Sequence, residues 1–370
     1  MKCIEIIKNI ENWAPKEIAW QKDNVGLQIG DTDKRIKNIL LCLEVNDRVV
    51  EEALKNNCNL IISHHPFFFS PLKKIDIAND RKSRLIDKLI KHDIILYAAH
   101  TNLDYTQDGV SFQLAERLEL QNINFLINLH SNQYKISIFV PENACDKVAN
   151  AIFNSGGGII GGYSNCSFRT KGNGTYKKSG NTRPALGKKE ELRLVDEIKL
   201  EVIIDRWKLH SVLTEIKKVH PYEEIAYDLV PLDNLNLNYG IGAVGYLPKD
   251  YNLKDFLSYI THKLKIDNFR YTNGKKKIIR KVAVCGGSGS EYFHDAISKN
   301  CDAYITADIK YHSFQDAEQE IFLIDAGHYE TEIFSLNEIR KRIVYHLNNK
   351  KDIKVYLYSG STNPVIFYNN

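Results

Sequence analysis

The chain has 370 residues, a formal net charge of +4 and seven cysteines. Its length suits about two domains, and an apolar content of 43% with 26% charged residues excludes a disordered or membrane-embedded class. The small net charge does not indicate binding to nucleic acid or to an anionic membrane. The cysteines are scattered without a C-x-x-C pair, so neither a disulfide framework nor a structural zinc site is expected.

The N-terminus predicts an amphipathic helix rather than a signal peptide. Glu5 and Lys8 interrupt the apolar pattern of MKCIEIIKNIENW, whereas a signal peptide needs an uninterrupted apolar core. No apolar run approaches the roughly 18 residues that cross a bilayer. We therefore expect a cytoplasmic protein that is not bound to a membrane.

The first third of the chain alternates short apolar runs with helical patterns. Asn46 or Asp47 is expected to cap the first helix of this region. The order predicts parallel strands joined by right-handed crossovers. The expected strands and helices are strand 38–45, helix 46–57, strand 60–65, helix 80–93 and strand 94–104.

The composition changes after about residue 128, and a glycine-rich stretch, 156–189, is expected to be a loop. Around it the pattern predicts a small α+β unit, after which strand and helix alternate again to the C-terminus. The simplest interpretation is one α/β domain, 1–128 with 268–370, split by an insert at 129–267. The other expected elements are strand 134–141, helix 142–155, strand 198–205, helix 207–220, strand 224–232, strand 276–290, helix 291–299, strand 303–308, a helix that includes 313–320, strand 321–328 and a long C-terminal helix.

Metal-ligating side chains are expected at the carboxyl ends of three strands. His64 and His65 end the expected strand 60–65. Asp104 ends the expected strand 94–104, and His328 ends the expected strand 321–328. Ligands of open parallel sheets gather at these ends. Glu332 follows His328 by four residues, so on a helix the two side chains share a face.

This donor set suits zinc, iron or manganese, and the residue types alone do not choose among them. Five ligands suggest two ions, because a carboxylate can bridge while adjacent histidines diverge. Two ions held together can activate water, so a hydrolytic centre is a natural hypothesis. A structural role for the histidines stays open.

Further polar residues lie near the expected strand ends. His100, Asp308 and His312 are candidates for proton transfer or for support of the metal ligands, and Asp308 is equally suited to capping a helix. CGGSGS, 285–290, is either a phosphate cradle or a tight turn. The basic run 171–189 is either solvated surface or a contact for phosphates or nucleic acid.

Six blocks that occur in order along nearly the whole chain resemble the Nif-three-like family, whose members are also called GTP cyclohydrolase 1 type 2 homologues. The middle segment, with GGYSNCSF and VHPYEEIAYDLVPL, resembles the insert of the longer bacterial members, a small ferredoxin-like domain. The six blocks are WQKDNVGLQIG (20–30), SHHPFFFSPLKKI (63–75), YAAHTNLD (97–104), GGSGS (286–290), AYITADIKYH (303–312) and DAGHYETE (325–332).

The resemblance implies a split Nif-three-like α/β domain with an inserted α+β ferredoxin-like domain, two divalent ions per subunit and a toroidal homohexamer. By this resemblance His65 and Asp104 would serve one ion, His64 and His328 the other, and Glu332 would bridge both. The chain departs from the family pattern at two positions outside this ligand set. They are Glu44, where Asp is expected, and Ala307, where Gly is expected.

The leading functional hypothesis is a metal-dependent hydrolase acting on a nucleotide or another phosphate-bearing compound. The family name implies GTP, but the chain shows no guanine-reading motif. The alternative is a non-catalytic metal-handling or regulatory protein whose insert gates the metal cavity. A ring that binds DNA through basic loops ranks last, since the net charge of +4 gives it little support.

Overall fold

The computed structural model describes residues 1–130, 132–177, 192–348 and 352–368. Unit 1 comprises Met1–Ile127 with Tyr239–Asn370, and unit 2 comprises Asn128–Asn238. The sequence-based end of the insert at 267 therefore differs from the structure, since the chain re-enters unit 1 at Tyr239. In the part of the chain that the structure describes, no helix combines the length and apolar content needed to cross a membrane.

The first sheet of unit 1 has the strand order β1-β4-β3-β2-β15, with β4, β3, β2 and β15 parallel and β1 antiparallel to β4. Its strands are β1 (Gly26–Ile29), β2 (Ile39–Cys42), β3 (Leu60–Ser63), β4 (Ile95–Ala98) and β15 (Val355–Leu357). The helices packed on it are α1 (Cys3–Trp13), α2 (Asp47–Lys55), α3 (Arg81–Lys91) and α12 (Ser335–Leu347).

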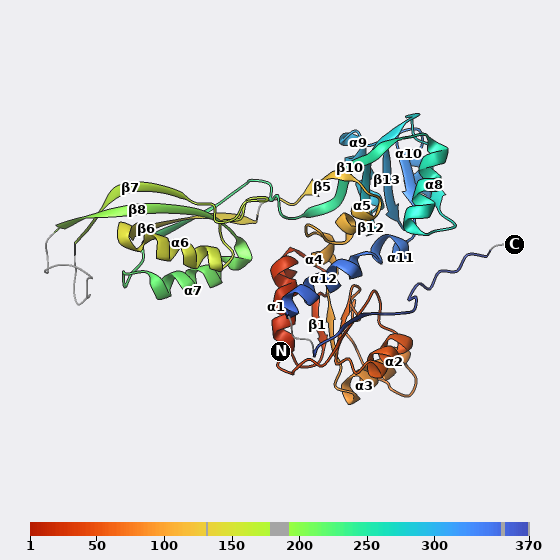
Figure 1. Cartoon of the computed structure of the whole chain (residues 1–370), viewed down its shortest axis with the longest axis horizontal. Coiled ribbons are helices and arrows are strands. Elements are labelled where there is room, and N and C mark those ends of the chain that lie inside the picture. The colour runs from red at the N-terminus through yellow and green to blue at the C-terminus, as the bar shows by residue number, and fades with distance from the viewer. Residues whose placement is uncertain (131, 178–191, 349–351, 369–370) are drawn as a thin grey trace. The chain divides into compact units, whose positions relative to one another are not determined.

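Helices cover both faces of this sheet, which explains its uninterrupted apolar strands. Successive side chains of a strand point to opposite faces. Leu41 and Ile62 belong to the core with α1 and α12, whereas Leu40 and Ile61 belong to the core with α2 and α3. Figure 1 shows these two pairs of helices on opposite sides of the sheet.

The second sheet of unit 1 has the order β11-β14-β13-β12-β10-β5, and β12, β13 and β14 are parallel. Its strands are β5 (Gln121–Asn128), β10 (Gly240–Tyr251), β11 (Arg270–Tyr271), β12 (Ile279–Ser288), β13 (Ala303–Ala307) and β14 (Phe322–Asp325). Helices again cover both of its faces. They are α5 (Val110–Arg117) and α8 (Leu253–Leu264) on one side and α9 (Phe293–Ser298) and α10 (Tyr311–Ala317) on the other.

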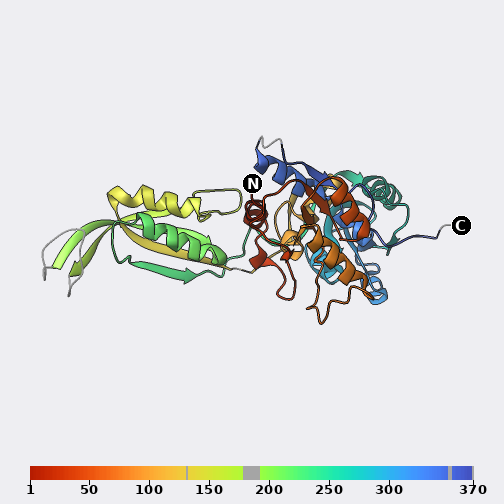
Figure 2. The ribbon, with the colours of Figure 1, turned by 90° about the horizontal axis from the view of Figure 1, so that it is seen from below.

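Unit 2 has the element order β-α-β-β-α-β, which is that of the ferredoxin-like motif. Its sheet has the order β7-β8-β6-β9 with antiparallel neighbours. Figure 2 shows α6 and α7 side by side against one face of this sheet. The elements are β6 (Gln133–Pro141), α6 (Cys145–Asn154), β7 (Phe168–Lys177), β8 (Leu192–Asp205), α7 (Leu209–Val219) and β9 (Tyr227–Pro231).

Three of the expected elements have a different type or extent in the structure. Part of the glycine-rich stretch forms β7 rather than a loop, because β8 supplies partners for its backbone; residues 178–189 of the basic run lie outside the described residues. The strand expected at 94–104 ends at Ala98, so Asp104 lies on the short helix α4 (Thr101–Asp104). The C-terminal helix is divided into α11 (His328–Glu332) and α12.

Candidate metal centre

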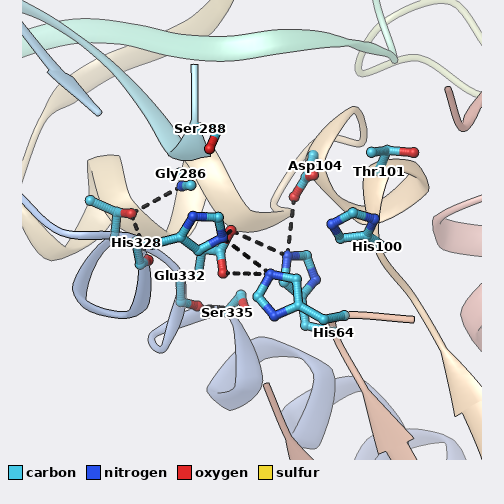
Figure 3. A network of polar contacts seen from close by, with 12 residues as sticks. His64, His100, Thr101, Asp104, Gly286, Ser288, His328, Glu332 and Ser335 are labelled. Carbon is cyan, nitrogen blue, oxygen red and sulfur yellow. Dashed lines mark hydrogen bonds and ion pairs between the residues drawn. The ribbon is translucent and has the colours of Figure 1, made fainter. Parts of the chain in front are cut away.

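The two sheets of unit 1 direct their carboxyl ends toward one site. His64 and His65 directly follow β3, and Asp104 ends α4, which comes after β4. His328 and Glu332 lie one turn apart on α11, which comes after β14 of the second sheet. Figure 3 shows the side chains of His64, Asp104, His328 and Glu332 converging from different elements. The structure therefore brings together all five residues that the sequence singled out as metal ligands.

Glu332 lies at the middle of this cluster and is buried, with a side chain 3% exposed. Its Oε1 is 3.0 Å from His328 Nε2 and 3.6 Å from His64 Nε2, and its Oε2 is 3.2 Å from His65 Nε2. Figure 3 draws these contacts as dashed lines. The carboxylate thus faces all three imidazoles at once, which is the position that a bridging ligand needs.

The remaining distances pair the ligands differently from the division between two ions that the resemblance implies. His64 Nε2 lies 3.6 Å from Asp104 Oδ1, and His65 Nε2 lies 3.2 Å from His328 Nε2. The expected division places His65 with Asp104 and His64 with His328. Which ligands serve which ion stays a prediction.

Several atoms of the cluster are buried without a hydrogen-bond partner. They are His64 Nε2, Asp104 Oδ1 and Glu332 Oε2. A buried polar atom left unpaired costs about 1–3 kcal/mol, so it calls for a specific reason. Because all three are lone-pair donors facing one site, a bound cation explains them, and the residues fit a metal centre. Among the described residues, two groups have metal-donor atoms that all lie within 4.8 Å of one another. One group is His65, His328 and Glu332, and the other is His64, His65 and His100.

The three histidines are oriented from the side opposite the cluster. His64 Nδ1 donates to the Ala99 carbonyl at 2.8 Å, which leaves Nε2 as the free lone pair of the neutral ring. His65 Nδ1 lies 3.0 Å from Glu44 Oε1, and His328 Nδ1 lies 2.6 Å from Asp308 Oδ2. Such outer partners fix the ring orientation of metal-ligating histidines.

A second layer of hydroxyl groups holds these carboxylates. Thr362, from the segment after β15, donates to Glu44 Oε2. Ser288, at the end of β12, donates to Asp308 Oδ2. The sequence patterns gave Glu44 and Thr362 no role in the centre, because their partners are distant in the chain. Glu44 was noted only as a departure from the family pattern.

The electrostatics of the cluster favour a cation. Burial lowers the pKa of His65, but Glu332 and Glu44 outweigh it and raise that pKa to about 10. Burial likewise lowers the pKa of His328, and Glu332 with Asp308 raises it to about 9. Burial raises the pKa of Glu332, yet the surrounding histidines hold it well below its usual range. Glu332 is therefore ionised, and a divalent ion would bind the imidazoles in their neutral form.

Gly287 explains the first part of the CGGSGS motif. Its φ is +64°, and a methyl group on it would lie 2.2 Å from Glu332 Oε1. The amide of Gly287 donates to Thr331 Oγ1 at 3.0 Å, and that of Gly286 donates to Ser111 Oγ at 3.2 Å. The glycines therefore allow close approach to the metal ligands, and two of the amides expected in a phosphate cradle are bound within the protein.

The three candidate proton-transfer residues have different surroundings. His100 lies beside the cluster, with its ring centroid 5.1 Å from that of His64, and its Nδ1 contacts Asp23 Oδ2 at 2.9 Å. Asp308 contacts His328 rather than the centre of the cluster. His312 is exposed on α10, and no hydrogen bond or ion pair within the described ranges joins it to the five ligands. The role of Asp23 had no signal in the sequence pattern.

The fold and the site together define a split α/β protein with a histidine and carboxylate cluster between the ends of two sheets. The chain belongs to the Duf34/NIF3 (NGG1p interacting factor 3) family, whose model matches residues 1–364. This finding confirms the family resemblance that the six sequence blocks indicated.

Relatives match over most of the chain. The GTP cyclohydrolase 1 type 2 homolog of Bacillus subtilis (strain 168) is 37% identical over 365 residues, which cover 98% of each chain. That of Listeria monocytogenes is 39% identical over 322 residues, or 86% of each chain. Among solved structures, a Bacillus cereus protein related to NIF3 is 35% identical with a TM-score of 0.88, covering 100% of this chain and 99% of that one.

Proposed function

We propose that this chain is a dinuclear metal-binding protein and a metal-dependent hydrolase of a nucleotide or another phosphate-bearing substrate. The unpartnered buried atoms of His64, Asp104 and Glu332 support this most directly, since they meet at one site. Zinc, iron and manganese all accept such a mixed set of imidazoles and carboxylates. When bound, a pair of such ions supplies Lewis acidity and lowers the pKa of water.

The protein side chains would contribute binding, orientation and proton transfer. His64, His65, Asp104, His328 and Glu332 would hold the ions, with Glu332 in the bridging position. His100 is oriented by Asp23 through Nδ1, which leaves Nε2 available to move a proton to or from the substrate.

Metal content per chain, measured by elemental analysis after purification without chelators, tests the centre. We expect about two ions in the native protein and one or none in Glu332→Ala, because the bridging carboxylate is lost. Glu330→Ala is the matched control on the same helix, since its Oε1 bonds to Asn363 rather than to the cluster; it should keep both ions. A native protein that takes up no metal even after reloading would refute the proposed centre.

Turnover by the metal-loaded chain on a panel of nucleotides and phosphoesters tests the hydrolase. His100→Asn should retain its metal and lose about a hundredfold or more in kcat, the typical contribution of a positioned acid or base. A loaded native protein that hydrolyses no member of the panel would favour the metal-handling alternative instead.

The homohexamer implied by the resemblance also stays a prediction. Sedimentation of the full chain measures it directly, and a monomer at micromolar concentration would refute it.

A further inference from the structure

A surface cavity of about 450 Å³ lies between the loop before β1 and the loop after β3. Lys22 and Asn24 line it from the loop before β1, and Phe68, Phe69 and Leu72 line it from the loop after β3. The volume is in the range of small-molecule sites, which are mostly apolar with a few polar groups. The cavity combines these two kinds of residue.

The loop that carries Phe69 is fixed, although the Phe69 ring is not covered. Asn24 Nδ2 donates to the Phe68 carbonyl at 2.7 Å, and the Phe68 amide donates to Gln28 Oε1 at 3.2 Å. Gln28 Nε2 in turn donates to the Asn24 carbonyl at 2.7 Å. Phe69 is nevertheless 64% exposed. The Phe69 ring is therefore accessible for stacking by a bound ring.

Phe69 connects the cavity to the metal centre. Its ring lies edge to face with His100, with the centroids 6.0 Å apart and the planes at 87°. The His100 ring is in turn 5.3 Å from that of His65. A planar group stacked on Phe69 would therefore lie within one small molecule's length of the ligand cluster.

The loop before β1 adds a second exposed ring and a cation. Trp20 is 56% exposed, and its amide donates at 2.9 Å to Thr101 Oγ1, next to His100. The Lys22 ammonium lies 5.9 Å from the centroid of the Trp20 ring. In the described part of the chain, no carboxylate forms an ion pair with Lys22, so its charge is available to an anion.

We propose that Phe69, Trp20 and Lys22 form a subsite for a planar heteroaromatic ring that bears an anionic group. Phe69 and Trp20 would stack on the ring of the ligand, and the Lys22 ammonium would neutralise its anionic group, such as a phosphate. This inference rests on the proposed function for the position of the reacting centre and narrows its substrate class to nucleotides and similar phosphorylated ring compounds. Binding of the ring itself requires no metal.

Calorimetric titration of the metal-loaded full chain with AMP, GMP, ribose 5-phosphate and adenosine tests the subsite. We expect AMP or GMP to bind at least about tenfold more tightly than ribose 5-phosphate, because a base can stack on the aromatic side chains and the sugar cannot. Phe69→Ala should weaken nucleotide binding about tenfold, whereas Phe69→Tyr should bind nucleotides as tightly as the native protein. Lys22→Gln should weaken nucleotide binding and leave adenosine binding unchanged.

Tyr345→Ala is the matched control, since Tyr345 is an exposed aromatic residue on α12, 86% accessible and absent from the cavity lining. Tyr345→Ala should change neither the affinity for nucleotides nor the affinity for adenosine. Equal binding of ribose 5-phosphate and nucleotides, absence of nucleotide binding, or unchanged nucleotide affinity in Phe69→Ala would overturn the proposal. If Phe69→Ala alters only the sedimentation of the protein, the surface is a contact between subunits and the proposal is likewise overturned.

Repeating the titration after chelation separates the two proposals. If the native protein binds no metal but still prefers nucleotides through Phe69, the hydrolase proposal fails and the subsite stands. If the protein keeps two ions but shows no preference for the ring, the subsite fails and the metal centre stands.

Discussion

The three histidines of the cluster use their ring nitrogens in the same way, with Nε2 toward Glu332 and Nδ1 toward an oxygen acceptor. The acceptors differ in kind. His64 uses a backbone carbonyl, while His65 and His328 use the carboxylates of Glu44 and Asp308. The metal affinity of the proposed centre should therefore depend on Glu44 and Asp308, which lie outside the five candidate ligands.

Glu44→Gln should lower metal affinity by about 10- to 100-fold, the usual effect of losing an outer carboxylate partner of a ligating histidine. Thr362→Val should also lower metal affinity, but by less, since Thr362 bonds to Glu44 and does not itself contact His65. Competition with a chromophoric chelator measures the affinity. Glu51→Gln, whose carboxylate pairs with Lys88 on the surface, is the control and should bind as the native protein does.

A purely structural role for Glu44 would predict something different. Both Glu44→Gln and Glu44→Ala would then lower the unfolding midpoint of the chelated protein and leave the absorption spectrum of bound cobalt unchanged. A positioning role predicts a changed spectrum, with Gln closer to the native protein than Ala because the amide retains a hydrogen bond.

Gly287→Ala should weaken the metal centre. A methyl group there would lie 2.2 Å from Glu332 Oε1, and the backbone φ of +64° disfavours any side chain. We expect loss of bound metal and about 1–2 kcal/mol of destabilisation in the chelated protein, measured by urea unfolding. Gly162→Ala is the control, because nothing lies within 4 Å of the added atom. Full metal content in Gly287→Ala would contradict this interpretation.

Neighbouring strands of unit 2 are joined by a charged group as well as by their backbones. Glu201 on β8 lies directly opposite Ser137 of β6 and accepts from its hydroxyl at 3.0 Å. Lys135 and Lys199 approach the same carboxylate oxygen at 3.1 and 3.2 Å. Bonds from Lys135 and Lys199 lower the pKa of Glu201 to about 2.

This lowered pKa makes the contribution of Glu201 depend on pH. The folded-state pKa lies below the ordinary value of 4.5, so the stabilisation is present above about pH 4.5 and is lost as the pH falls toward 2. Glu201→Gln should cost under about 1 kcal/mol at pH 7, because solvent screens the pair. Urea unfolding at pH 7 and pH 3 should show this difference shrinking at the lower pH, and an equal difference at both would contradict it.

The two ends of unit 1 that flank unit 2 lie close together. A methyl group on Gly240 would lie 2.4 Å from the Ile127 carbonyl oxygen. Closely spaced ends are what a host domain needs to accept an insertion. Unit 1 also contains all five candidate ligands and its own apolar cores.

Replacing 128–238 with a short Gly-Ser linker should therefore leave unit 1 folded and able to bind about two ions, as judged by thermal unfolding and elemental analysis. Metal exchange, followed with a chromophoric chelator, should proceed at the same rate as in the full chain. A large change in that rate would support the alternative in which the insert gates the metal cavity. Loss of cooperative unfolding would show that unit 1 depends on the insert.

Local sequence patterns were sufficient for much of the fold and for placing the five candidate ligands near one another. Apolar runs predicted β2, β3 and β4 because both faces of these strands are buried, and Asn46 caps α2 through the Val49 amide as its residue type suggests. The candidate ligands could be found because His64 and His65 directly follow β3, while Asp104 and His328 lie on the helices that come after β4 and β14. A parallel sheet collects its ligands beyond these carboxyl ends.

Tertiary structure alone decided what depends on residues distant in the chain. The glycine-rich β7 is a strand only because β8 pairs with it, and the second boundary of unit 2 follows from the pairing of β10 with β12. Glu44 contacts His65, and Thr362 donates a hydrogen bond to Glu44. These residues are far apart in the chain, so no local sequence pattern predicts the contacts. Hydrophobic periodicity reports the neighbours of a residue within its own element, whereas these contacts arise only when separate elements fold onto one another.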